Sequence, residues 1–147
     1  MYEIEINIPA LCAEVTDDAV IDDRNRKDES GQPIAADHAP DTTLEDFFTR
    51  ILAGVASDVL TAIKPRIEAY RITSVFIHYR IGHWSGVSPD RAATLIKDAL
   101  KVGLLTYWYA TQDTQLYPVY AARYAASLDN LKYEAAGSVA ERPYRMI

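Results

Sequence analysis

The sequence is poor in cysteine, in glycine and in long apolar runs. Its 147 residues contain one cysteine, Cys12, so neither an internal disulfide nor a cysteine-based zinc site can form. The six glycines are dispersed and none belongs to a phosphate-binding G-x-x-x-x-G-K motif, which argues against nucleotide hydrolysis. The longest apolar stretch, 102–110, is interrupted by Thr106 and is far shorter than the roughly 20 residues of a membrane span. We therefore expect no membrane association.

The N-terminus lacks the layout of a secretory signal. Residues 2–8 alternate between polar and apolar types, whereas a signal has a charged region followed by an apolar one. This pattern predicts a cytoplasmic protein. The chain is 49% hydrophobic and 24% charged, as is ordinary for a globular protein, and its length predicts a single domain over residues 1–147.

Charge is distributed unevenly along the chain. Residues 1–46 hold thirteen acidic and three basic residues, whereas the remainder is basic, and the whole chain carries −6. An acidic segment that faces a basic partner would explain the asymmetry, and so would a solvated surface. Because the chain is acidic overall, nucleic acid is not an expected partner.

The hydrophobic pattern predicts a mainly helical α+β fold, with about three long helices packed on a small antiparallel sheet. Residues 2–8 alternate strictly, which predicts a half-buried strand that Pro9 ends. Between residues 70 and 81 most positions are β-branched or aromatic, which predicts a second strand. We expect it to pair antiparallel with the first and to be covered by helices on one face.

Two helices are predicted from apolar residues spaced by three and four positions. The first begins at a capping box formed by Thr42 and Glu45 and ends at Pro65. The second has Ser88 as its N-cap and extends to about residue 110. Gly103 lies in the middle of this helix, and a second helix that crosses closely at that point would explain it.

A third helix is predicted from Thr114, its N-cap, to Gly137, followed by a tail at about 138–147. Residues 16–43 are rich in Asp, Asn, Ser, Gly and Pro and show no sustained period, which predicts a long acidic loop. Loops of this length in compact domains are commonly functional or disordered.

No motif for catalysis or metal binding satisfies its spacing rules. Residues 82–86 contain the letters of a nucleophile elbow, but the serine is misplaced and no helix follows directly. His38, His78 and His83 lack the local spacing that supports a metal site, so a structural role is the simpler interpretation. We therefore assign no catalytic residue, no cofactor and no metal, and expect a protein that is not an enzyme.

Aromatic residues gather around the junction of the second and third helices. They are Tyr107, Trp108, Tyr109, Tyr117, Tyr120 and Tyr124. Tyrosine and tryptophan are favoured where an apolar body meets a wet rim, so this set is a candidate protein interface. The alternative is that the same aromatics cap one end of the core.

The order of features along the chain offers one further indication. It consists of the strand Met1 to Pro9, a Thr- and Asp-rich loop, the helix with Leu44-Glu45-Asp46-Phe47-Phe48, the strand Val75 to Ile81 with His83-Trp84, the segment Leu104 to Tyr109, and the helix Ala121 to Leu131 with its tail Arg142-Pro143-Tyr144-Arg145. This layout resembles small proteins encoded in prophages of Bacteroidetes, which look like head-to-tail connector (neck) proteins of tailed phages. The resemblance implies a structural subunit that assembles into rings through protein contacts with itself or with phage structural proteins, and that ends up in the virion.

Two other functional classes stay open. Residues 88–105, which end in Lys101-Val-Gly-Leu-Leu, are similar to the helix-then-turn of winged-helix DNA-binding domains and would make the protein a regulator. No basic wing follows, and the acidic charge opposes this interpretation. An enzyme with an unrecognised site is the second alternative. We expect a non-enzymatic assembly protein.

Overall fold

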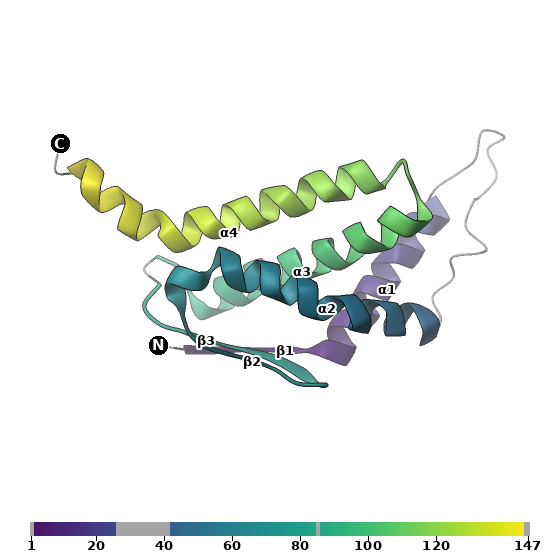
Figure 1. Cartoon of the computed structure of the whole chain (residues 1–147), viewed down its shortest axis with the longest axis horizontal. Coiled ribbons are helices and arrows are strands. Elements are labelled where there is room, and N and C mark those ends of the chain that lie inside the picture. The colour runs from purple at the N-terminus through teal and green to yellow at the C-terminus, as the bar shows by residue number, and fades with distance from the viewer. Residues whose placement is uncertain (1, 26–41, 85, 146–147) are drawn as a thin grey trace.

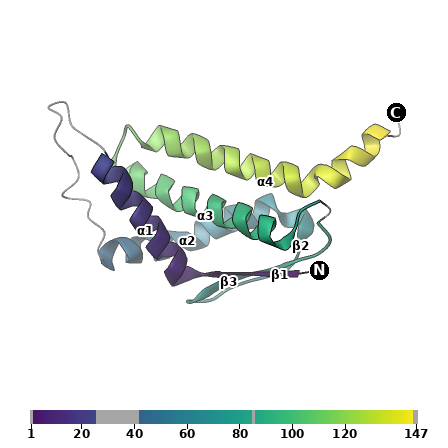
Figure 2. The same cartoon turned by 180° about the vertical axis from the view of Figure 1, so that it is seen from behind.

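The computed structural model describes residues 2–25, 42–84 and 86–145 and places four helices on one side of a three-stranded antiparallel sheet (Figures 1 and 2). The elements are, in chain order, β1 (Tyr2–Asn7), α1 (Ile8–Asn25), α2 (Thr42–Ala62), the 3-10 turn η2 (Lys64–Arg66), β2 (Ile67–Ile72), β3 (Phe76–Ile81), α3 (Pro89–Gln112) and α4 (Tyr117–Arg145). The predicted mainly helical α+β class is confirmed, with one long helix more than expected.

Strand β1 follows from the alternation of residues 2–8. Its isoleucines Ile4 and Ile6 are buried, whereas Glu3 and Glu5 on the other face are exposed. β1 pairs antiparallel with β3, as predicted, and β3 is the central strand in the order β1-β3-β2.

The strand predicted between residues 70 and 81 is a hairpin. β2 and β3 pair antiparallel, and the chain reverses between them at residues 73–75. The Thr73 hydroxyl oxygen accepts hydrogen bonds from the backbone N–H groups of Val75 (3.2 Å) and Phe76 (3.0 Å). The Thr73 side chain thus organises a turn that contains Ser74 but no Gly, Pro, Asn or Asp.

The acidic loop predicted at 16–43 is wrong over its first part, because α1 continues to Asn25. One face of α1 is buried at helical spacing, and its residues are Leu11, Cys12, Val15, Thr16 and Ala19. The helix begins where the Asn7 side chain accepts a hydrogen bond from the Ala10 N–H (2.8 Å). Residues 26–41 of the predicted loop lie outside the described residues, and its last two residues, 42–43, belong to α2.

The helices predicted from residue 42 and from Ser88 are confirmed as α2 and α3, although α2 ends at Ala62, before Pro65. The side chains of the predicted capping box, Thr42 and Glu45, lie outside the described residues. The Ser88 side chain accepts a hydrogen bond from the Arg91 N–H (3.2 Å), which makes Ser88 the N-cap of α3. A Cβ atom at Gly103 would lie 2.6 Å from Val55 Cγ1 and 2.8 Å from Tyr124 Cε1. α2 and α4 therefore both approach α3 closely at Gly103, as the glycine predicted.

The predicted limits of the last helix are wrong at both ends. Asp113, rather than Thr114, caps the chain before α4, because its carboxylate accepts from the N–H groups of Gln115 (2.7 Å) and Leu116 (3.1 Å). α4 passes through Gly137 and ends at Arg145, so residues 138–145 are helical and only 146–147 lie outside the description.

α4 changes direction in its C-terminal part (Figure 1). Just before this bend, the Trp84 indole N–H donates to the Glu134 carbonyl (3.0 Å) and Arg66 Nε donates to the Ala135 carbonyl (2.6 Å). Side chains that insert into the helical ladder and Gly-Ser pairs such as Gly137-Ser138 are both known causes of bends, and both occur at this point of α4.

The helices form two levels above the sheet. α2 and α3 lie next to the strands, α4 packs on α3 and α2 on the far side, and α1 packs against α2 and α3 at one end (Figures 1 and 2). None of the described helices combines the length and hydropathy of a membrane span.

Candidate functional site

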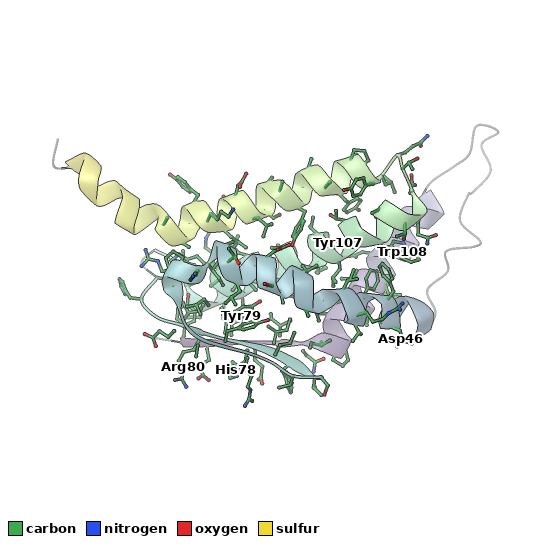
Figure 3. The ribbon with its side chains drawn as sticks, viewed as in Figure 1. Asp46, His78, Tyr79, Arg80, Tyr107 and Trp108 are labelled. Carbon is green, nitrogen blue, oxygen red and sulfur yellow. The ribbon has the colours of Figure 1, made fainter. Side chains whose placement is uncertain are left out.

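The six aromatic residues singled out in the sequence do not form one surface. Tyr107, Trp108 and Tyr109 are consecutive in α3, and successive helical residues point about 100° apart. They therefore point in three directions, and two of them are labelled in Figure 3.

Trp108 belongs to the packing between α3 and α2. Its ring meets the ring of Phe47 at 5.5 Å and that of Phe48 at 6.2 Å between centroids, both edge to face. Phe48 is fully buried, and Trp108 is half-buried against the same core. Such edge-to-face pairs stabilise a core beyond the area that they bury.

Tyr109 and Tyr120 are core residues as well. Tyr109 is fully buried, Tyr120 is 8% exposed, and their rings lie 4.8 Å apart between α3 and α4. The Arg123 guanidinium lies 5.1 Å from the centroid of the Tyr120 ring and covers it from the solvent side.

The remaining three aromatics reach solvent to different degrees. Tyr107 and Tyr117 are 44% and 42% exposed. Tyr124 is half-buried, and its hydroxyl donates a hydrogen bond to Asp58 Oδ2 (2.8 Å) across the contact between α4 and α2. Burial, together with this hydrogen bond, raises the pKa of Tyr124 well above its usual range. The hydroxyl is therefore a neutral donor that joins two helices.

A different part of α4 presents apolar groups to solvent. An outer stripe on this helix consists of Val119, Ala122, Ala126 and Tyr133, all exposed. Val119 is 45% and Tyr133 74% exposed, whereas Leu131 and Ala135 on the opposite face are buried. The exposed face of α4 is thus apolar at these four positions, with the polar residues Asp129 and Asn130 between Ala126 and Tyr133.

The open face of the sheet carries charged groups. Figure 3 shows His78 and Arg80 pointing away from the helices, opposite to Tyr79. Glu3 Oε1 accepts from Arg80 Nη2 (3.1 Å), and Glu3 Oε2 lies 3.3 Å from His78 Nε2. The hydrogen bond from Arg80 is the main reason why the pKa of Glu3 is below its usual value. Arg71 completes one side of this face, which is hollowed by a shallow depression of about 380 Å³.

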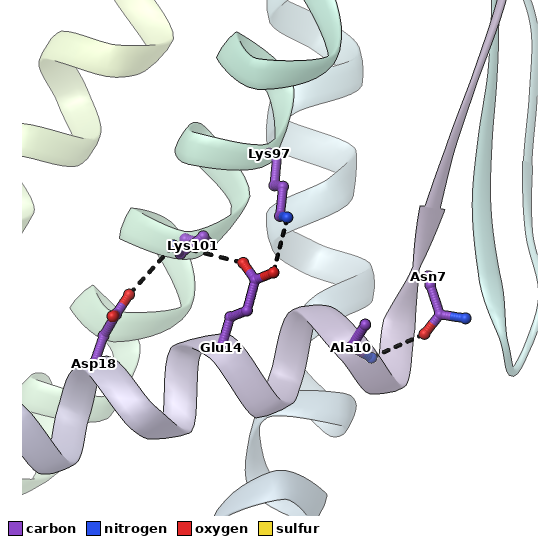
Figure 4. A network of polar contacts seen from close by, with 6 residues as sticks. All are labelled: Asn7, Ala10, Glu14, Asp18, Lys97 and Lys101. Carbon is purple, nitrogen blue, oxygen red and sulfur yellow. Dashed lines mark hydrogen bonds and ion pairs between the residues drawn. The ribbon is translucent and has the colours of Figure 1, made fainter.

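A second charged network links α1 to α3 (Figure 4). Lys97 Nζ donates to Glu14 Oε1 (2.9 Å), and Lys101 Nζ lies 3.3 Å from Asp18 Oδ2 and 3.7 Å from Glu14 Oε2. The hydrogen bond from Lys97 is the main cause of a lowered pKa of Glu14. These partly exposed acids serve to attach α1 to α3, so part of the N-terminal acidic charge is used within the fold.

The structure offers no grouping of metal ligands among the described residues, where no cluster of three or more His, Cys, Asp and Glu side chains occurs. His78 lies on the open face, whereas the backbone carbonyl of His83 accepts a hydrogen bond from Arg66 Nη1 (3.0 Å). His38 lies outside the described residues.

The turn expected by the winged-helix interpretation is not formed. Gly103, Leu104 and Leu105 lie within α3, which continues for seven more residues to Gln112. The similarity at residues 88–105 is therefore one of sequence and not of local structure.

Comparisons with known proteins found no match for this chain, whether with protein-family models, with curated proteins or with solved structures.

Proposed function

We propose that the protein is a non-enzymatic assembly subunit that acts through protein–protein contacts, of the class to which the head-to-tail connectors of tailed phages belong. The observation that carries this proposal is the outer stripe of α4. The corresponding locations are the cytoplasm, where subunits assemble, and the virion.

A helix at the surface of a globular protein normally turns its polar face to solvent. The outer stripe breaks this rule at Val119 and Tyr133, which are large and exposed, and at two alanines that leave room for close approach. A tyrosine that is 74% exposed offers a large rigid contact area with little loss of side-chain freedom on binding. Such side chains are enriched at protein interfaces.

The partner that we assign to this stripe is a second copy of the chain. α4 is the outermost helix and extends past the end of the sheet (Figures 1 and 2), and the four residues of the outer stripe are exposed. The resemblance in layout to connector proteins supports a homo-oligomer, since those proteins assemble into rings.

The experiment is light scattering behind a sizing column over a range of concentrations. The mass of the wild-type chain should rise to one defined oligomer, and Tyr133→Ser should move this rise to higher concentration without lowering the melting temperature. Lys132→Ser, an exposed neighbour off the stripe, is the matched control and should change neither. A monomeric mass at every concentration would overturn the proposal.

A further inference from the structure

We propose that copies of this chain join edge to edge, with β2 of one copy adding to β1 of the next so that their sheets become continuous. The inference rests on the proposed function, because it adds a second contact between the subunits of the assembly, separate from the outer stripe of α4. It is carried by the two edges of the sheet, which complement each other in backbone, charge and shape.

Both edges of the sheet can accept another strand. In the order β1-β3-β2, β1 and β2 each pair only with β3 among the described residues. Edge strands present a row of backbone N–H and C=O groups to any strand that approaches. Because β1 and β2 are both antiparallel to β3, they are parallel to each other, and addition of β2 to the next β1 is a parallel pairing.

Opposite charges lie at the two edges of the open face, at positions that pair with the same residue of β3. We call such a set of residues, one from each strand, a row. The register places Glu5 and Arg71 on either side of His78. Within the part of the chain that the structure describes, neither Glu5 nor Arg71 has an ion-pair partner. When β2 joins the next β1 in the same rows, Arg71 comes to lie beside Glu5 of the next copy, as Arg80 already lies beside Glu3 within the sheet.

The adjacent row on the covered face is complementary in shape. In this row Ile77 of β3 pairs with Ile6 of β1 on one side and with Ile72 of β2 on the other. Ile72, at the β2 edge, is 38% exposed. At the β1 edge, a hollow of about 250 Å³ is lined in part by Ile6, Leu11 and Ala93, and polar residues, among them Asn7, Thr94 and Lys97, line the rest of it. Addition of β2 would bring Ile72 beside Ile6 of the next copy and over this hollow. The charged pair and the apolar pair thus require the same register.

Symmetric pairing of two β1 edges is disfavoured by their own side chains. Two antiparallel β1 strands would bring the acids Glu3 and Glu5 of both copies together, and like charges across strands destabilise a sheet. The pairing of β2 with β1 is heterologous, because it joins two different edges. An open assembly of any length therefore keeps one unpaired edge at each end. Repeated addition therefore builds a ring if the rotation closes, and a filament if it does not.

A charge exchange tests the junction, again by mass against concentration. Glu5→Arg and Arg71→Glu should each raise the concentration needed for association about tenfold, since attraction is replaced by repulsion. The double variant should return this concentration close to that of the wild type. Arg50→Glu, an exposed charge on α2 away from the sheet, is the control and should have no effect, and melting curves check that all variants fold.

Each alternative outcome points to a different error. If the wild type associates but the single variants do so equally well, the copies meet elsewhere, and this inference fails while the proposed function stands. If both single variants weaken association and the double variant does not restore it, the register of the junction is wrong. A wild type that stays monomeric overturns both proposals.

Discussion

The two faces of the small sheet differ completely, although the same strands supply both. Toward the helices, Ile4, Ile77 and Tyr79 are at most 4% exposed and form part of the core. Toward solvent, Glu3, His78 and Arg80 form a charged network. Alternation along a strand separates the two roles residue by residue. It follows that the open face and its edges can be altered for contact without loss of the fold.

The sharpest test of this separation uses two neighbouring residues of β3. Ile77→Ala should lower the free energy of unfolding by about 3 kcal/mol, because it leaves a cavity at a fully buried position. His78→Ala, which points to the open face, should change it by less than about 0.5 kcal/mol. Urea unfolding of both variants gives the comparison. Equal losses for the two would show that the open face also holds the fold together.

The layer of helices that covers the sheet can be tested with two glycines. Gly103→Ala should lower stability by about 1 kcal/mol, since the clash with Val55 and Tyr124 exceeds the gain in helix propensity. Gly54→Ala should raise stability by about 0.5 to 1 kcal/mol, because no atom lies within 4 Å of the added Cβ. The same unfolding assay applies. Stabilisation by both substitutions would mean that α4 does not approach α3 closely at this point.

Tyr79 offers a finer test of the covered face. Its hydroxyl is buried without a hydrogen-bond partner among the described residues, and burial raises the pKa of Tyr79 far above its usual range. Tyr79→Phe should therefore raise the free energy of unfolding by about 1 kcal/mol. Tyr124→Phe should lower it by a similar amount, since it removes the hydrogen bond to Asp58. A loss of stability in Tyr79→Phe would reveal a partner for that hydroxyl.

The smallest effect concerns acid stability at the open face. The pKa of Glu3 is lowered on folding, so its contribution to stability is present above the ordinary value of 4.5 and is lost as the pH falls through the folded value. Glu3→Gln should therefore make the loss of stability at acid pH less steep. Salt should reduce the difference from the wild type, because the group is exposed. Melting temperatures across the acid range, at low and high salt, give the measurement; identical slopes would remove the Glu3 contribution.

Much of the fold could be predicted because its signals are local. Each signal depends on residues that are close together in the sequence, as in the alternation of β1, the apolar stripe of α2 and the Ser88 cap. α1 was missed because its buried face includes the small or polar residues Cys12, Thr16 and Ala19, which carry little hydrophobic signal. The hairpin was missed because its turn, Thr73-Ser74-Val75, contains no Gly, Pro, Asn or Asp and is organised by the Thr73 side chain.

The candidate surfaces were harder to predict, because they depend on which helix covers which face. The prediction of one aromatic interface placed Tyr107, Trp108 and Tyr109 on the same surface because they are close in sequence. Consecutive residues of a helix point in different directions and cannot share a face. Glu5 and Arg71 are far apart in sequence, and they are aligned only because both pair with the same residue of β3.

Hydrogen exchange as a function of protein concentration tests most directly whether the copies join through their sheet edges. Raising the concentration should slow exchange of the outward-facing amides of β1 and β2, because they become paired. Amides of β3 should not change, since β3 is already flanked on both sides. If the mass rises with concentration while exchange at β1 and β2 stays the same, the edges are not the junction.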